Sequence, residues 1–368
     1  MNPSATLDRR TTGTWSGTQP RATVERVADD KALLRTAAEL SRDLHAAKPA
    51  IYWGDLIASV VIGYGALAGA ILLPTAWAIV SGVVAIFALY RAGSFIHEVS
   101  HMKHGQVPWF RLGWNMLVGM PLMIPSFMYE GVHNLHHAKT RYGTVDDPEY
   151  LPLALMKPWS VPLFTVAAAL GPIALLFRFA ILSPLSIAIP ALRRTIAARF
   201  SALAINPAFR RRDVTGDYRK LWVQLEIATS IWAIALLALV VTDVVPFRAF
   251  AIFLGILSVT MVLNQVRTLV AHLWENDGEA MSVTAQYLDS VNVPPPAVLP
   301  MLWAPVGLRY HALHHLLPGV PYHSLGEAHR RLTAAVDADS PYHKASYSGL
   351  PGLLAGLIKS TFGTARRR

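Results

Sequence analysis

The sequence contains no cysteine and little charge. The absence of cysteine from all 368 residues excludes disulfides, thiolate metal sites, iron–sulfur clusters and cysteine nucleophiles from this chain. Charged residues make up only 15% of the sequence and hydrophobic residues 53%. An ordinary soluble domain has about 25% charged residues. A chain this apolar is hard to keep dispersed in water, so the composition indicates a membrane protein.

The charge deficit is concentrated in segments of membrane-spanning length. No charged residue occurs between Asp55 and Arg91, and low-charge apolar runs recur at 227–242 and 249–266. A spanning helix needs about 17–25 apolar residues. The sequence therefore predicts an all-α membrane protein with about four transmembrane helices in two hairpins. We expect these helices at 52–73, 75–97, 221–242 and 247–272.

Two further apolar stretches, 112–128 and 159–192, are interrupted by prolines and do not have the pattern of an ordinary spanning helix. Basic residues gather at 193–220, and basic loops stay on the cytoplasmic side of a membrane. If the N-terminus is also cytoplasmic, the chain crosses the membrane an even number of times before 193–220. We therefore expect both interrupted stretches to be re-entrant, interfacial or paired.

The two ends of the chain differ from its apolar middle. Residues 1–50 are polar, and we expect a partly disordered segment there with an amphipathic stretch at 31–47 and no cleavable signal peptide. A membrane domain is expected at 51–330 and a basic C-terminal tail at 331–368. The expected location is a bacterial inner membrane, with both termini cytoplasmic; an endoplasmic reticulum membrane also fits. Topology accounts for the net charge of +10, so nucleic acid is not an expected partner.

Histidine has the most informative spacing of any residue type. Ten of the fourteen histidines lie in "HEVSHMKH" (97–104), "HNLHH" (133–137) and "HALHH" (311–315), or at His272. On an α-helix, residues i, i+3 and i+4 lie on one face, so each cluster directs its imidazoles the same way. The predicted topology places all three clusters in a cytoplasmic helical cap. Packing has no use for repeated imidazoles that must be desolvated, so this spacing predicts metal ligands.

The number of imidazoles indicates two metal ions. Nine exceed the four ligands of a tetrahedral zinc but suit two ions with four or five nitrogens each and an open position. We expect iron, because imidazole suits iron and an open position beside an apolar cavity can bind O2 next to an unactivated C–H bond. Nitrogen ligands alone leave zinc, copper, cobalt and manganese open.

These residues resemble the integral-membrane fatty acid desaturase superfamily, whose members share the boxes HxxxH, HxxHH and a second HxxHH. The run "YHALHHLLPGVPYHSL" (310–325) is similar to the third-box region of bacterial acyl-lipid desaturase-like proteins. The resemblance covers about 51–330 and implies two iron ions at the cytoplasmic mouth of four transmembrane helices. The ligands that it implies are His97, His101, His133, His136, His137, His272, His311, His314 and His315. His104 is a further candidate.

The resemblance implies oxygen activation but does not choose the reaction, because the same scaffold serves desaturation, hydroxylation and ketolation. We predict an oxidoreductase that uses O2 as co-substrate to desaturate a fatty acyl lipid chain. The alternative is a hydroxylase or ketolase of an acyl chain, alkane, sphingoid base or carotenoid. A metal carrier or haem-binding membrane protein is a further class, but a bis-histidine haem would leave most of these histidines unexplained.

The electrons must come from another protein. The chain has no GxGxxG fingerprint, no cysteine for a cluster and no recognisable cytochrome domain, so a ferredoxin- or cytochrome-type donor is implied. The basic segment 193–220 is a candidate docking site for an acidic donor. Three carboxylates directly after the second box are candidates to hold ligating imidazoles by their second N–H, the alternative being a polar turn. They are Asp146, Asp147 and Glu149.

Overall fold

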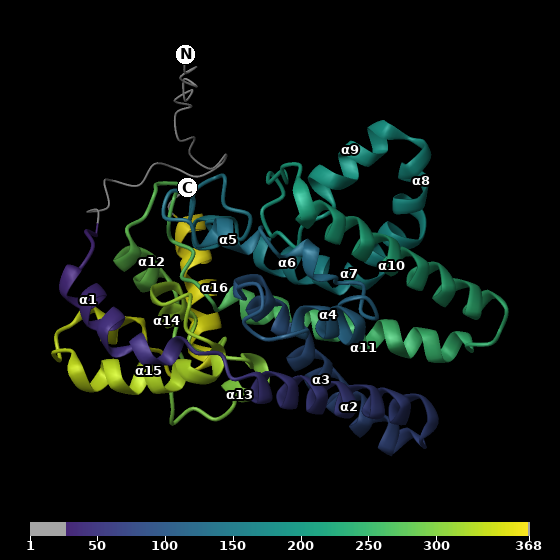
Figure 1. Cartoon of the computed structure of the whole chain (residues 1–368). Helices are drawn as coiled ribbons and strands as arrows, with labels where there is room; N and C mark the ends of the chain where they lie inside the picture. The colour runs from purple at the N-terminus through teal and green to yellow at the C-terminus, as the bar shows by residue number, and fades with distance from the viewer. Residues whose placement is uncertain (1–26, 367–368) are drawn as a thin grey trace, which may run out of the picture.

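The computed structural model describes residues 27–366, which form helices with three isolated β-bridges and no strand (Figure 1). The prediction of an all-α chain is confirmed. Five helices in the described part of the chain are long and apolar enough to cross a membrane, which fits an integral membrane protein. They are α2 (Pro49–Leu72), α3 (Thr75–His101), the continuous segment Gly171–Ala188, α10 (Gly216–Val241) and α11 (Phe247–Leu269).

Helices α2 and α3 pack along each other as a hairpin (Figure 1). Gly63 of α2 makes the close approach possible, because a Cβ atom at this position would lie 2.7 Å from Cδ2 of Leu89 in α3. Small residues have this role in membrane helices, whose association depends on close packing. The outward faces carry exposed apolar side chains such as Val61, Ile62 and Trp77, as expected for surfaces that face lipid.

The predicted second hairpin is not confirmed. Although α10 and α11 are joined by a short loop, α11 packs against α3, α6 (Ser160–Ala169) and α7 (Gly171–Phe177). Helix α10 packs instead against the π-helical turn Arg178–Leu182 that joins α7 to α8 (Ser183–Ala188). In a hairpin, α10 and α11 would cover each other. Here the segment 160–188 packs against both of them instead.

The charge that interrupts the apolar pattern of 159–192 is neutralised within the fold. Arg178 is buried, and its guanidinium lies 2.8 Å from a carboxylate oxygen of Glu226 in α10. Arg193, in α9 (Pro190–Arg199), lies 2.8 Å from the other oxygen of Glu226. This pairing satisfies the buried charges and ties the segment to α10. The re-entrant or interfacial placement of the segment stays a prediction.

Short helices form a cap at one end of the long ones (Figure 1). Residues 112–128 form no long helix: α4 (Phe110–Trp114) continues into a π-helical turn that ends at Gly119. Figure 1 shows α12, α14, α15 and α16 gathered beyond the end of α3, with α1 against α15. The bounds of the helices named here for the first time are α1 Lys31–Leu40, α5 His133–His136, α12 Val283–Asp289, α13 Pro300–Trp303, α14 His311–Leu316, α15 Tyr322–Ala335 and α16 Leu350–Arg366.

The predicted division into three parts stays a prediction. The polar segment 1–50 falls in part on residues 1–26, which lie outside the described residues. Within 331–368, α15 runs through the expected boundary as far as Ala335, and α16 packs against Leu153–Leu155.

The contact between α2 and α3 predicts a difference between two glycines on one helix. Gly63→Leu should destabilise the protein by about 1–3 kcal/mol, because the new side chain would be forced into Leu89. Gly65→Leu is the matched control, since a Cβ there would have no atom within 4 Å. Thermal unfolding in detergent should show a lower midpoint for the first variant alone. Equal midpoints would show that the close approach does not stabilise the fold.

Candidate metal centre

The structure brings nine of the ten singled-out histidines together in two groups, which we name by their members. Group one is His97, His101, His133, His137 and His314. Group two is His136, His272, His311 and His315. Within each group, one ring nitrogen from each residue lies within 4.8 Å of those of the others. All members of group two are buried, as are three of group one.

The backbone explains how residues so far apart in sequence meet. His97 and His101 lie one turn apart at the end of α3, and His272 lies just beyond the end of α11. The two HxxHH boxes form the short helices α5 and α14, with His137 directly after α5. The side chains at i and i+4 enter one group and the side chain at i+3 enters the other, because positions i+3 and i+4 differ by about 100° around a helix. Each box therefore contributes to both groups.

The Nε2 atoms converge at distances that suit ligands of a common ion. In group one, Nε2 of His314 lies 3.0 Å from Nε2 of His101 and 3.1 Å from Nε2 of His137. In group two, Nε2 of His311 lies 3.0 Å from Nε2 of His272. Two nitrogens bound to one metal at about 2.1 Å, at right angles, lie about 3 Å apart. The donor set therefore fits two metal ions.

Carboxylates fix the orientation of two of these rings. Nδ1 of His136 lies 2.9 Å from Asp147, and Nδ1 of His133 lies 2.8 Å from Glu149. An imidazole that donates its Nδ1–H to a carboxylate presents an unprotonated Nε2 on its other side. Nε2 of His136 is buried and has no hydrogen-bond partner among the described residues, as a nitrogen that awaits a metal would be.

A tyrosine relays a third carboxylate to His272. The hydroxyl of Tyr142 donates to Asp289 at 2.8 Å and lies 2.8 Å from Nδ1 of His272. Because its proton is donated to Asp289, the hydroxyl accepts a hydrogen bond from Nδ1–H of His272. Nε2 of His272 is then unprotonated and able to bind a metal. Burial raises the pKa of Asp289 to about 6 and that of Glu149 to about 7.

Burial also keeps most of these histidines neutral, which is the form that binds metals. It lowers the pKa of six of them well below the ordinary value, and neighbouring imidazoles lower it further. These six are His133, His137, His272, His311, His314 and His315. For His136, burial is the largest single influence and acts in the same direction, but the charge and hydrogen bond of Asp147, together with the charges of Glu149 and Asp289, outweigh it and the pKa is raised.

Two residues singled out in the sequence lie apart from the centre. His104 is exposed and belongs to neither group, and Asp146 is exposed although its neighbour Asp147 is fully buried. Three residues at the centre were not predicted from the sequence: Tyr142, Asp289 and Arg267, whose guanidinium lies 3.1 Å from Nδ1 of His311. Tyr142 follows the second box by five residues, whereas no local signal marks Asp289.

Comparison with known proteins bears on the same residues. Residues 73–348 match the fatty acid desaturase family. A ceramide hydroxylase of Caulobacter vibrioides (strain NA1000 / CB15N) is 49% identical over 335 residues, which are 91% of this chain and 95% of that protein. No solved structure matches the chain.

The ring orientation predicts that two adjacent aspartates differ in importance. Asp147→Asn should weaken metal binding about 10- to 100-fold, the usual effect of removing a carboxylate that orients a ligating imidazole. Asp146→Asn should leave metal binding unchanged, because this side chain is exposed. Metal per chain, measured by mass spectrometry after dialysis against a series of chelator concentrations, gives both affinities. Equal metal retention by the two variants would refute the role of Asp147.

Proposed function

Because the chain belongs to the fatty acid desaturase family, we propose that it is a membrane di-iron enzyme that uses O2 and external electrons to hydroxylate a ceramide-type lipid. One observation carries the choice of reaction, namely the 49% identity to a ceramide hydroxylase across 91% of the chain. In the sequence analysis, hydroxylation of a sphingoid substrate was the alternative, and the histidine boxes leave it open. It is now the preferred reaction, and desaturation of a fatty acyl chain, which was preferred there, becomes the alternative.

The nine histidines of groups one and two are the proposed ligands, five for one iron ion and four for the other. Iron bound in this donor set would supply the chemistry of reducing O2 and oxidising an unactivated C–H bond. His104 is not assigned to either ion. The distribution of each HxxHH box over both groups supports a pair of ions held at a fixed separation.

The protein's own residues have three tasks at this centre. Asp147, Glu149 and the Tyr142–Asp289 pair hold imidazoles in the orientation that a ligand needs. Burial of most of the histidines keeps water away from the reacting region, which strengthens every polar interaction there. The apolar outer faces of the long helices allow a lipid to reach the centre without leaving the membrane.

Part of the segment 112–128 belongs to the hydrophobic core and is not available to line a substrate channel. Met123, Phe127 and Met128 are buried in the main hydrophobic core, and the ring of Phe127 stacks on that of Trp222 in α10 at 5.0 Å. These side chains therefore have a packing role.

The proposed electron donor is a ferredoxin- or cytochrome-type protein with an acidic surface. Within 193–220, Arg193 is paired with Glu226, and Arg211 is buried and lies over the ring of Trp222 at 4.3 Å. Six basic side chains are exposed: Arg194, Arg199, Arg210, Arg212, Arg219 and Lys220. Lys220 is paired with Asp217 at 2.8 Å, and the other five are the candidates to contact a partner. We place this surface and both histidine groups on the cytoplasmic side of a bacterial inner membrane.

The proposal predicts a defined change in cellular lipids. Cells that contain ceramide and express this protein should accumulate ceramide with one additional oxygen atom, detected by mass spectrometry. His136→Ala should bring the product to background and lower the iron content, because it removes a buried nitrogen of group two. His343→Ala is the matched control, since this histidine belongs to neither group.

Three other outcomes would contradict this prediction. Ceramide that has lost two hydrogen atoms would identify a desaturase. Modified fatty acyl lipids beside unchanged ceramide would assign a different substrate. Full turnover by His136→Ala with its iron retained would refute the ligand assignment.

A further inference from the structure

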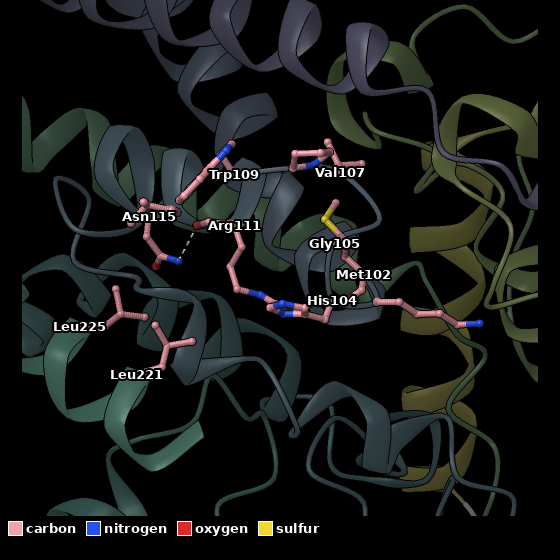
Figure 2. A pocket seen from close by; sticks show the side chains of 12 residues that line it. Met102, His104, Gly105, Val107, Trp109, Arg111, Asn115, Leu221 and Leu225 are labelled. Atoms are coloured by element: carbon pink, nitrogen blue, oxygen red, sulfur yellow. Dashed lines mark hydrogen bonds between the residues drawn. The ribbon is translucent and has the colours of Figure 1, made fainter. Parts of the chain in front are cut away.

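A cavity of about 380 Å³ lies beside the end of α3, formed by residues 102–109, α4 and α10 (Figure 2). Its size is within the range of sites for small ligands. Figure 2 shows Leu221 and Leu225 of α10 on the side opposite Trp109. Met102, Val107 and Leu112 add further apolar surface.

The polar side chains of the cavity fall into two kinds. Arg111 is ion-paired with Glu130, and Asn115 donates to the carbonyl of Arg111 and to the hydroxyl of Ser126. These two are occupied. Lys103 and His104 are exposed, and the structure gives neither side chain a hydrogen bond or ion pair within residues 27–366. Two residues that line the cavity therefore have side-chain hydrogen-bond donors that are free to reach a ligand.

The cavity lies where a membrane lipid could reach it. Met102 directly follows His101 of group one, so the cavity begins at the level of the proposed metal centre. Trp109, Leu112 and Met116 have exposed fractions of 76%, 51% and 56%. Tryptophan is enriched at the membrane–water interface, where its amphipathic ring is favoured. A molecule with an apolar chain and a head rich in oxygen acceptors matches both the wall and the free donors.

We propose that this cavity binds the polar head of the lipid substrate. Lys103 and His104 donate hydrogen bonds to oxygen atoms of the head, and the adjoining part of the chain lies against Leu221 and Leu225. The choice of a substrate lipid rests on the proposed function. The assignment gives His104, the one clustered histidine outside the two groups, a role in substrate binding instead of metal binding.

Steady-state kinetics with purified protein and ceramide in detergent tests the two donors. His104→Ala and Lys103→Ala should each raise KM about three- to tenfold, the usual effect of losing one hydrogen bond to a charged or polar group. The value of kcat and the iron content should not change, because neither residue touches the metal centre. Lys344→Ala removes an exposed lysine outside the cavity and is the matched control. Loss of iron in His104→Ala, or an unchanged KM in both cavity variants, would overturn the proposal.

A binding measurement that does not depend on turnover tests the location. Ceramide with a photoreactive diazirine near its head should label residues 102–112, and unlabelled ceramide should compete. Leu112→Trp should abolish this labelling by filling the cavity. Because Leu112 is half-exposed, the larger side chain should not disturb folding. Labelling elsewhere, or undiminished labelling of Leu112→Trp, would contradict the proposal.

The two proposals fail in different ways. Labelling of the cavity without oxidation of ceramide would refute the proposed reaction and retain the lipid site. Hydroxylation of ceramide with labelling outside 102–112 would retain the reaction and refute the site.

Discussion

The convergence of nine imidazoles is the constraint on which the rest of the structure depends. Unprotonated ring nitrogens about 3 Å apart repel one another, and burying them without a partner costs solvation free energy. Cations bound between the nitrogens, as proposed above, would offset this cost. The ends of α3 and α11 must therefore meet α5 and α14 at one place. The cap, the carboxylates behind the rings and the close packing of the long helices all keep them there.

The regular parts of this arrangement are predictable because their signals are local. Runs of apolar residues indicated α2, α3, α10 and α11 to within a few residues, and helical spacing indicated eight of the nine histidines that the structure gathers. The ninth, His272, stands alone in the sequence and was implied by the family resemblance. His104 was included because it continues the row of His97 and His101. That row ends because Met102 is extended and closes α3, so the next histidine leaves the helical face. Spacing has meaning only as far as the helix continues.

Contacts between distant residues were beyond prediction for a different reason. Tyr142 and Asp289 are 147 positions apart, and only the folded chain shows that they act together on His272. In the sequence, Arg178 likewise interrupts an apolar stretch. A count of charges does not show that Glu226, 48 positions later, will neutralise it. Its pairing with Glu226 allows a continuous helix of 18 residues there. The number of membrane crossings therefore cannot be derived from charge and length alone.

The alternation of histidines within each box has a consequence for how the protein can change. Since α5 and α14 each serve both groups, inserting one residue between the first and last histidine of a box would rotate the later ring by about 100° and misdirect it. Deleting a residue would do the same in the opposite sense. The boxes should therefore tolerate no change in length, whereas the loops between them are free to lengthen. For the same reason the two groups cannot diverge independently, because each of the two short helices contributes histidines to both.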